Sequence, residues 1–494
     1  MGIVFRQSVK SAIVTATGAL LGAITVYLSA LYLPKQELGF FRNTLPELAL
    51  LIAQILLFGL HSTLSVYIHK YPPGTPERNS LLGICLGIPI ISLLLLLPFY
   101  YLFQDTFVHI FREEDQTMIL TYYNGLPVFV FFFICLLLLE QFLISQMKVA
   151  LALFMREVIL RVLLIGLVIL YGFQLIDFSI LLPASIAVYV IPVLLVFFFS
   201  LRTGSFKPSF HWKHIPPTER KELVTFTWYH FLLSFSINLL NKLDIILLSM
   251  WAGLSAGAVY GIAVYILSFL YIPYRTMISA SLPILTQSYQ AGDIQKVKDI
   301  YSRSSLNILV AVSGLALLIA SNMHHAAALL GSGFEDIVPL VFILLVGRII
   351  EMATGMSEQL LSITSYYRFS FFLSLGIVLV ILTGNYLFIP VYGYFGAAVT
   401  TSLALIIYSI LKTGYIQFQL GLTPFSRNTL VILLITIIAG FFAWITPSFE
   451  HWIIDMLIRS TVVMLVYVSL MIWLKPSQDL NEYLASVIRN KRMF

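Results

Sequence analysis

Hydrogen-bonding and charged side chains recur within long apolar stretches of this chain, where they could bind an ion or a polar ligand. In the stretch 224–251 such residues repeat at helical spacing and fall within an arc of roughly 120°. They are His230, Ser234, Asn238, Asn241 and Asp244, with Lys242 one turn beyond Asn238. One hydrogen-bonding stripe on an otherwise apolar helix predicts the wall of a water-filled cavity. The alternative is that these side chains satisfy one another between packed helices.

A second set of charges lies near the centre of the apolar stretch 337–361. Arg348 and Glu351 are three residues apart and are therefore neighbours on a helix. A guanidinium suits phosphate because its planar fork can donate two hydrogen bonds at once. We therefore expect Arg348 and Lys242 to bind an anionic head group, with Asp244 and Glu351 as candidates for coupling to an ion. The alternative is that Arg348 and Glu351 only neutralise each other.

The stretch 45–68 carries a similar row of polar residues, separated by 7, 7 and 4 positions: Glu47, Gln54, His61 and Ser65. Such spacing places them on one side of a helix. Gln54 and His61 therefore join His230, Asn238 and Asn241 as candidate cavity residues. Packing between helices is the alternative for each.

Membrane-spanning helices must position these residues, because fourteen apolar stretches are each long enough to cross a bilayer. The hydrocarbon core needs about 20 apolar residues per helix, whereas a strand of a membrane barrel uses about 10 alternating residues. The composition is 59% hydrophobic and 11% charged, with a mean hydropathy of +0.94. The sequence predicts an all-α polytopic membrane protein with fourteen spans: 9–33, 45–68, 81–103, 118–144, 158–175, 178–201, 224–251, 256–281, 305–330, 337–361, 369–389, 393–415, 429–445 and 453–474.

The basic residues are distributed asymmetrically between the loops. Lys and Arg accumulate in cytoplasmic loops, and this bias orients membrane proteins. With a cytoplasmic N-terminus, 23 of the 29 Lys and Arg residues lie in inside segments and four in outside loops, and the other two are Lys242 and Arg348. The net charge of +6 is therefore a topology signal rather than a nucleic-acid interface. Residues 1–33 are expected to form a retained helix and not a cleaved signal.

The loops and motifs give an enzyme little support. No Walker A, HExxH or Ser/His/Asp pattern occurs, and the longest segments outside the spans, 202–223 and 282–304, are cytoplasmic. The largest outside loop, 104–117, holds four consecutive charged residues that indicate a solvated turn. Cys85 and Cys135 lie inside spans and form no metal or disulfide pattern. We expect no cofactor and no metal site.

Two short matches indicate an internal repeat. Residues 30–34 with 39–41 match 249–253 with 258–260 at an offset of 219, and Tyr171-Gly172 matches Tyr392-Gly393 at an offset of 221. Because six spans is an even number, the two halves would share one orientation. We predict an N-terminal lobe at 1–222, a C-terminal lobe at 223–427 in parallel pseudo-twofold repeat, and two appended helices with a cytoplasmic tail at 428–494.

Local patterns in order along the chain resemble a known family. They are Leu33-Pro34-Lys35-Gln36-Glu37-Leu38-Gly39-Phe40-Phe41; Asn241-Lys242-Leu243-Asp244 with Ala258-Val259-Tyr260; Leu282-Pro283 with Gly292-Asp293, Val297 and Tyr301; Gly331-Ser332-Gly333-Phe334 with Val338-Pro339-Leu340; and Ile389-Pro390-Val391-Tyr392-Gly393 with Gly396-Ala397-Ala398. The chain resembles the polysaccharide and O-antigen flippases of the multidrug/oligosaccharidyl-lipid/polysaccharide exporter superfamily. Lys242 stands where the family more often has Arg, so the charge is kept and the fork is lost.

The resemblance implies two six-helix lobes that alternate access to the two sides of the bacterial inner membrane. It implies a cargo of undecaprenyl-diphosphate-linked oligosaccharide, moved from the cytoplasmic to the outer leaflet for surface polysaccharide such as O-antigen, capsule or exopolysaccharide. A polysaccharide polymerase and a chain-length protein are the partners it suggests. A wet cationic groove would fit such a cargo, since bare hydrocarbon imposes a high cost on each charge.

Three alternatives remain open. A multidrug or toxin extruder of the same superfamily would need a carboxylate-lined cavity, whereas the charges here are mixed, and such extruders usually have twelve spans. A lipid II flippase also has fourteen spans, but the sequence indicates few buried arginines in the first lobe. A membrane-embedded polymerase or ligase would need a large outer loop.

The asymmetry of basic residues predicts that both termini are cytoplasmic. A reporter enzyme that is active only in the cytoplasm should therefore be active when it is fused to the C-terminus. A C-terminal fusion that is active only on the outer side of the membrane would contradict this topology.

Overall fold

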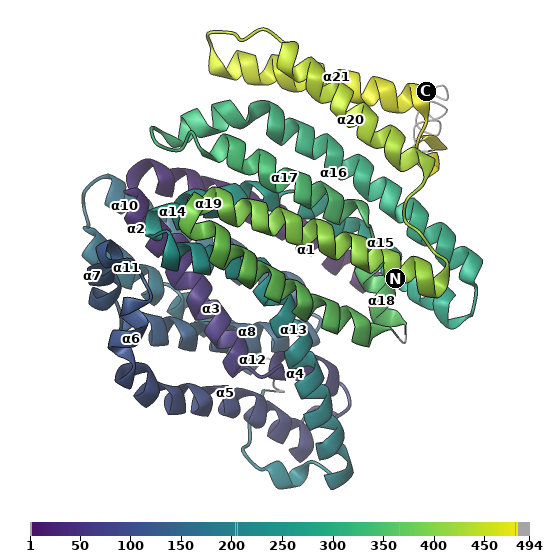
Figure 1. Cartoon of the computed structure of the whole chain (residues 1–494). Helices are drawn as coiled ribbons and strands as arrows, with labels where there is room; N and C mark the ends of the chain where they lie inside the picture. The colour runs from purple at the N-terminus through teal and green to yellow at the C-terminus, as the bar shows by residue number, and fades with distance from the viewer. Residues whose placement is uncertain (1, 203, 205, 365, 480, 483–494) are drawn as a thin grey trace. The chain divides into compact units, whose positions relative to one another are not determined.

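The computed structural model describes residues 2–202, 204, 206–364, 366–479 and 481–482, and their side chains except at 2–9, 12, 233, 237, 240, 241 and 367. In this part of the chain the regular structure is helical and no strand occurs, which confirms the predicted all-α class. The chain divides into two compact units, Met1–Ala258 and Val259–Phe494. Figure 1 shows the course of the chain.

Unit 1 contains thirteen α-helices, two short π-helical segments and one 3-10 turn among its described residues. They are α1 (Gly2–Tyr32), α2 (Lys35–Gly39), π segment η1 (Phe40–Thr44), α3 (Leu45–Leu56), α4 (Leu60–Tyr67), α5 (Pro76–Leu102), α6 (Gln104–His109), α7 (Glu113–Thr121), α8 (Gly125–Ser145), α9 (Val149–Phe154), π segment η2 (Met155–Ile159), α10 (Leu160–Gly172), α11 (Phe178–Ala187), α12 (Val190–Arg202), η3 (Trp212–His214) and α13 (Pro217–Trp251).

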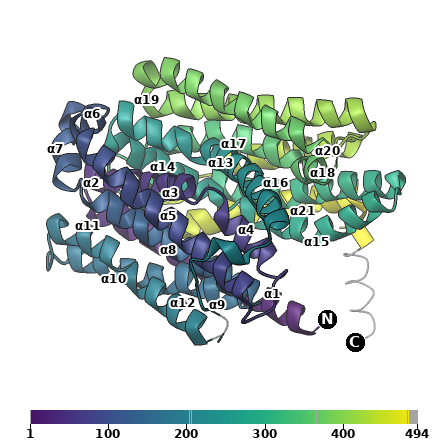
Figure 2. The same ribbon diagram turned by 90° about the horizontal axis from the view of Figure 1, so that it is seen from below.

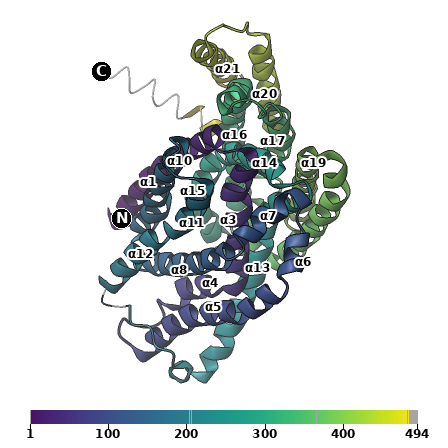
Figure 3. The same cartoon turned by 90° about the vertical axis from the view of Figure 1, so that its left-hand side faces the viewer.

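The helix α8 is central to the packing of unit 1. It packs against α3, α4, α5 and α12, and Figure 3 shows these helices close to end-on. The long helix α1 packs instead against α9, η2 and α10, near the N-terminus in Figure 2. The helix α13 packs against α3 and α4, which groups it with unit 1. The predicted lobe boundaries at 222/223 and 427/428, and the parallel repeat, remain predictions.

Unit 2 is built on the long helix α16. After α14 (Leu254–Ser268), which begins in unit 1, its helices are α15 (Tyr271–Gln290), α16 (Ile294–Leu330), α17 (Ile337–Ala353), α18 (Ser357–Ile363), α19 (Tyr367–Leu420), α20 (Arg427–Ile445) and α21 (Trp452–Leu474). Gly393, with φ +55°, kinks α19 into two apolar helices. The last pair, α20 and α21, packs on α16 (Figure 1) through a buried core that includes Leu309, Ile435 and Tyr467.

The described helices confirm a multi-pass membrane protein but not the count of fourteen spans. Nine of them are long and apolar enough to cross a membrane, or twelve if each of three bent pairs is one span. The predicted spans 158–175 and 224–251 are not among them. In the first, the helix α10 covers only 160–172 and follows η2 with Arg156 and Glu157, and the second carries the polar stripe of α13.

A break at Phe58-Gly59 separates α3 from α4 and bends the pair by 58°. Both residues have positive φ, 46° and 79° respectively, which is strained for Phe. A Cβ on Gly59 would come within 2.6 Å of the Thr227 carbonyl oxygen in α13. Glycine at this position therefore allows both the turn and the close approach of α13.

The sequence predicted that the charged segment 112–115 is a solvated turn. In the structure this segment begins α7, and one of its residues is buried. Asp115 is only 1% exposed. Its carboxylate accepts hydrogen bonds from the Gln36 side chain, at 2.8 Å, and from the Leu254 backbone N–H, at 2.9 Å. The sequence interpretation is wrong for Asp115 because these donors come from segments 79 and 139 residues away.

The same region contains the closest backbone approach in unit 1 that a glycine permits, at Gly39. An added Cβ there would lie 1.8 Å from the Leu254 carbonyl oxygen. We predict that Gly39→Ala lowers the melting temperature of the purified protein in detergent, since overpacking typically costs about 1–3 kcal/mol. Gly166→Ala is the matched control, because no heavy atom lies within 4 Å of its added Cβ. Equal melting temperatures for the two variants would contradict this account.

Candidate functional site

Lys242, the candidate cation of α13, is paired with Glu47 at the start of α3. The Lys242 Nζ lies 2.5 Å from Glu47 Oε1. The Lys242 side chain is 38% exposed and the Glu47 side chain 18%. The second carboxylate oxygen, Oε2 of Glu47, is buried and has no hydrogen-bond partner. The pair therefore combines an accessible cation with a carboxylate that is only partly satisfied.

Several other predicted cavity residues lie on the same two segments, α3–α4 and α13. His61 is half-buried, its Nδ1 has no hydrogen-bond partner, and its ring interacts electrostatically with His230. The His230 ring lies 4.1 Å from that of Phe226. Asn238 donates to the Ser234 backbone oxygen at 2.7 Å, and Gln54 is half-buried.

The structure does not place two residues of the α13 stripe, Asp244 and Asn241, in a cavity. Asp244 is 5% exposed, and its carboxylate accepts the N–H of the next residue, Ile245, at 2.8 Å. The side chain of Asn241 lies outside the described part of the structure. The stripe is therefore partly internal to α13, and the assignment of these residues to a cavity or to ion coupling stays a prediction.

The first turn of α13 contacts the loop after α4. The Tyr71 hydroxyl donates to the Glu219 carboxylate, and Lys70 Nζ lies 3.3 Å from the same group. The hydrogen bond from Tyr71, followed by the contact with Lys70, lowers the pKa of Glu219 against the opposing effect of its partial burial. This contact holds the end of α13 on unit 1 while the carboxylate is ionised.

The sequence interpretation missed an ion cluster inside unit 1, which we call the α8–α10 cluster: Glu140, Arg156, Glu157 and Arg161. Arg156 Nη1 lies 2.9 Å from Glu140 Oε2, and Arg156 Nε lies 3.2 Å from Glu157 Oε1. Arg161 Nη2 lies 2.5 Å from Glu157 Oε2. The Glu140 side chain is 6% exposed, and its Oε1 is buried without a partner.

The backbone of three elements positions this cluster. The π segment η2 contributes Arg156 and Glu157, and such segments often occur at functional sites. Arg161, one turn later, donates to the Gly18 carbonyl oxygen of α1. A Cβ on Gly18 would lie 2.7 Å from the Glu157 Cβ, so glycine lets α1 lie directly on the ion pair.

The buried Tyr189 connects the cluster with the Lys242–Glu47 pair. Its hydroxyl interacts electrostatically with Glu47, Arg42, Arg156 and Arg161, and the side chain is 8% exposed. Tyr189 thus interacts with charges of both groups, and Arg78, Asp115 and Asp244 are further charged residues buried in unit 1.

Among the described arginines of unit 1 only Arg78 is buried, which agrees with the expectation of few buried arginines in the N-terminal part. Arg78 is 4% exposed and donates to the backbone oxygens of Ile68 and Tyr71. The Arg156 and Arg161 side chains are 39% and 27% exposed within helices. The sequence could have revealed Glu140, which stands alone in an apolar run and needs a cation.

Arg348 lies in unit 2 and is enclosed by partners. Its Nη1 lies 2.9 Å from Glu351 Oε2, and it donates to the Tyr271 hydroxyl, which in turn donates to Glu351 at 3.2 Å. The Arg348 residue is 8% exposed. The expected ion pair is therefore present, while binding of cargo by Arg348 and ion coupling through Glu351 remain predictions.

A second buried network of unit 2 surrounds Glu358. Its carboxylate accepts from Ser370, at 2.6 Å, and from Tyr408. Lys412 is 3% exposed in α19, and its Nζ lies 4.6 Å from the centre of the Tyr408 ring. No cluster of metal-ligating residues occurs among the described residues.

The α8–α10 cluster makes a direct prediction about stability. Arg156→Gln should leave Glu140 buried without its cation and destabilise the fold by about 3–5 kcal/mol, which is typical of a broken buried pair. Arg156→Gln/Glu140→Gln should recover most of the loss, measured by denaturation in detergent. Arg303→Gln, which breaks an exposed pair with Asp299, should cost about 1 kcal/mol or less. A double variant as unstable as the single one would contradict the pairing.

Comparison with known proteins identifies the family of the chain. Residues 5–289 match the profile of a family described as "Polysaccharide biosynthesis protein". Comparison with curated protein sequences finds no match.

Solved structures share the fold. The lipid II flippase MurJ, in an inward closed conformation, is 16% identical, with 93% of this chain and 97% of that chain covered and a TM-score of 0.72. An inward-facing multidrug resistance transporter of the MATE family is 15% identical, with 83% and 98% covered and a TM-score of 0.61. A transporter of the MOP superfamily from Pyrococcus furiosus, described as having a binding pocket of reverse polarity, is 14% identical, with 85% and 95% covered and a TM-score of 0.55.

At these identities the structural likeness shows the fold alone, which is that of transporters of the multidrug/oligosaccharidyl-lipid/polysaccharide superfamily. The family match spans more than half of the 494 residues. The chain belongs to the family of polysaccharide biosynthesis proteins and is a multi-pass membrane protein.

Proposed function

We propose that the protein moves undecaprenyl-diphosphate-linked oligosaccharide from the cytoplasmic to the outer leaflet of the bacterial inner membrane by alternating access. The observation that carries the proposal is the Lys242–Glu47 pair, an accessible cation among the membrane helices of unit 1. A diphosphate needs such cations, the glycan needs polar walls, and the lipid tail can stay in the bilayer.

The geometry of the Lys242–Glu47 pair suggests how it binds and releases the diphosphate head group. An unpaired cation at the centre of a membrane helix costs about 2.5–3.5 kcal/mol even on the lenient insertion scale. Glu47 supplies the counter-charge in the unliganded protein, at 2.5 Å from Lys242. A diphosphate oxygen replaces Glu47 on binding, and Glu47 replaces the diphosphate on release. Lys242 is therefore never left without an anion during the cycle.

The α8–α10 cluster and Tyr189 extend the same polar interior. Arg156 and Arg161 are each only half-buried, so they can contact a ligand while Glu140 and Glu157 hold their guanidinium groups in place. The extruder alternative has less support, because each of these carboxylates is already paired with a cation.

A cargo like that of MurJ is the second candidate. The MurJ structure is titled a lipid II flippase and shares this fold. Among the described arginines of unit 1 only Arg78 is buried, so the low content of buried arginine still speaks against this cargo. The family description favours surface polysaccharide. We place a polysaccharide polymerase and a chain-length protein beside the transporter, and both termini in the cytoplasm.

Lys242 variants test the proposal by complementation of a strain that lacks its polysaccharide flippase. Lys242→Gln should lower surface polysaccharide at least tenfold with normal amounts of protein in the membrane, whereas Lys242→Arg should keep most of the export. The matched control is Lys221→Gln, an exposed lysine of the same helix, which should export normally.

Two results would decide against this function. If Lys242→Gln lowers the amount of protein, and Lys242→Gln/Glu47→Gln restores both protein and export, the pair is only structural and the cargo assignment fails. If the wild-type gene instead rescues a strain depleted of its lipid II flippase and not the polysaccharide strain, the second cargo is the correct one.

A further inference from the structure

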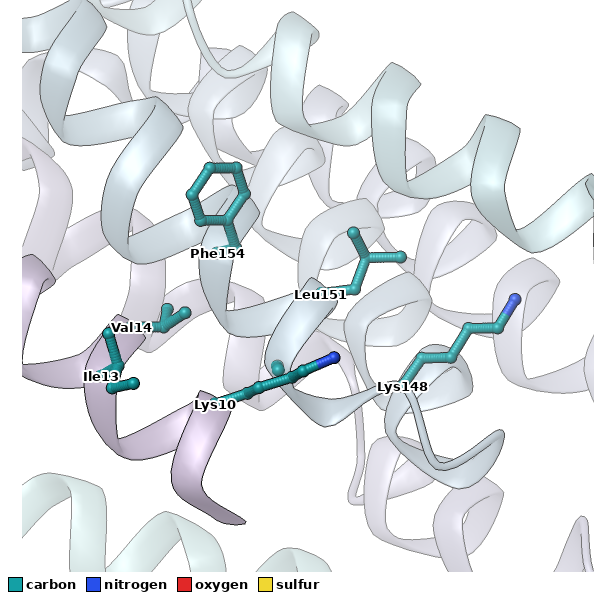
Figure 4. A pocket seen from close by; sticks show the side chains of 7 residues that line it. Lys10, Ile13, Val14, Lys148, Leu151 and Phe154 are labelled. Atoms are coloured by element: carbon teal, nitrogen blue, oxygen red, sulfur yellow. The ribbon is translucent and has the colours of Figure 1, made fainter. Parts of the chain in front are cut away.

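A pocket outside the polar interior of unit 1 lies between residues 10–14 of α1 and the helix α9 with the residue that precedes it. Its cavity volume is about 410 Å³, and its lining includes Lys10, Ile13, Lys148, Leu151 and Phe154. Figure 4 shows Lys10 beside Ile13 and Val14, with Leu151 between Lys10 and Lys148. Among the described side chains, no acidic residue lines the pocket. The pocket thus joins two positive charges to an apolar wall.

The two lysines lie at the depth of the lipid head groups. The apolar part of α1 runs from Ile13 to Tyr32, which is 20 residues, or about 30 Å at 1.5 Å per residue and therefore the thickness of the hydrocarbon core. Lys10 lies one turn before this segment. Lys148 directly precedes α9, which continues through η2 into α10. Because Lys10 and Lys148 line one pocket, we infer that both ammonium groups lie near the same membrane interface.

Both the apolar wall and the two lysines of the pocket are accessible to a ligand. Ile13 is 62% exposed and Phe154 is 40% exposed, so apolar surface is accessible to a ligand. Neither Lys10 nor Lys148 forms an ion pair with a carboxylate in the described part of the chain. Long lysine stems commonly lie along apolar surface while the ammonium group stays at the interface.

We propose that this pocket is a docking site for a lipid with a diphosphate head group, in which the cargo is held before it enters the polar interior. The proposal rests on the proposed function. A diphosphate diester carries two negative charges and matches two ammonium groups, whereas a membrane phosphatidylglycerol carries one. The hydrocarbon tail lies against Ile13, Leu151 and Phe154. Under the predicted topology the pocket is on the cytoplasmic side, where the cargo is loaded.

Binding of geranylgeranyl diphosphate to the purified full-length protein in phosphatidylcholine nanodiscs tests the proposal. Lys10→Gln/Lys148→Gln should weaken binding at least tenfold, and Lys10→Arg/Lys148→Arg should retain it. The matched control Lys296→Gln/Lys298→Gln removes two exposed lysines of α16 and should change the affinity less than twofold. Leu151→Ser should weaken binding at least threefold through the apolar wall alone.

Further ligands identify the occupant. Short-chain phosphatidylglycerol that binds as tightly as geranylgeranyl diphosphate, and is lost equally in the Gln pair, would overturn the proposal in favour of an ordinary anionic-lipid site. Inorganic pyrophosphate that binds as tightly as the lipid would also overturn it, because the apolar wall would contribute nothing. An unchanged affinity in the Gln pair would do the same.

The measurements are repeated in Lys242→Gln protein, so that binding at the Lys242–Glu47 pair cannot account for the result. A tenfold loss on adding Lys10→Gln/Lys148→Gln in that background supports the docking site, whatever the outcome of the export assay. Normal binding by the Gln pair together with loss of export in Lys242→Gln would overturn the docking site alone.

Discussion

The cost of placing a charge in hydrocarbon is the constraint on which the interior of this protein depends. An ionised side chain in a membrane helix needs water, an anion or a paired partner. Glu47 provides that partner for Lys242, Glu140 and Glu157 do so for Arg156 and Arg161, and Glu351 does so for Arg348. The Lys242–Glu47 and Arg156–Glu140 pairs join different helical segments and so help to fix their positions, whereas Arg161–Glu157 and Arg348–Glu351 are neighbours along the chain.

The backbone departs from regular helix at the places where these charges occur. The segment η1 carries Arg42, and η2 carries Arg156 and Glu157. A π-helical turn adds a residue to the turn and redirects the side chains that follow. The break at Phe58-Gly59 lies between Gln54 and His61, against α13. Irregular backbone is tolerated at membrane depth where it is buried in protein or lines a cavity, which agrees with a polar interior in unit 1.

Composition and local spacing were sufficient to predict the fold class, the family and one ion pair. Hydropathy predicted the all-α membrane fold, ordered motifs predicted the family, and the three-residue separation predicted the Arg348–Glu351 pair. Lys242 and Glu47 were each recognised, but their pairing was not, because they are 195 residues apart. Arg161 and Lys412 lie within the predicted spans 158–175 and 393–415, four residues from Glu157 and Tyr408, so helical spacing could have paired them but was not applied there. Arg156 and its partner Glu140 are 16 residues apart, and only the folded chain shows that they are close.

Reconstituted transport tests the central claim, that the charges of unit 1 serve an anionic lipid-linked cargo, most directly. Purified wild-type protein in liposomes would receive a fluorescent short-chain polyprenyl-diphosphate sugar, and dithionite quenching would report the fraction in each leaflet. The account predicts protein-dependent exchange of this probe between leaflets, with slower exchange of a neutral polyprenyl glycoside of equal length. Exchange of the neutral probe at the same rate, or export of ethidium in place of the diphosphate probe, would contradict it.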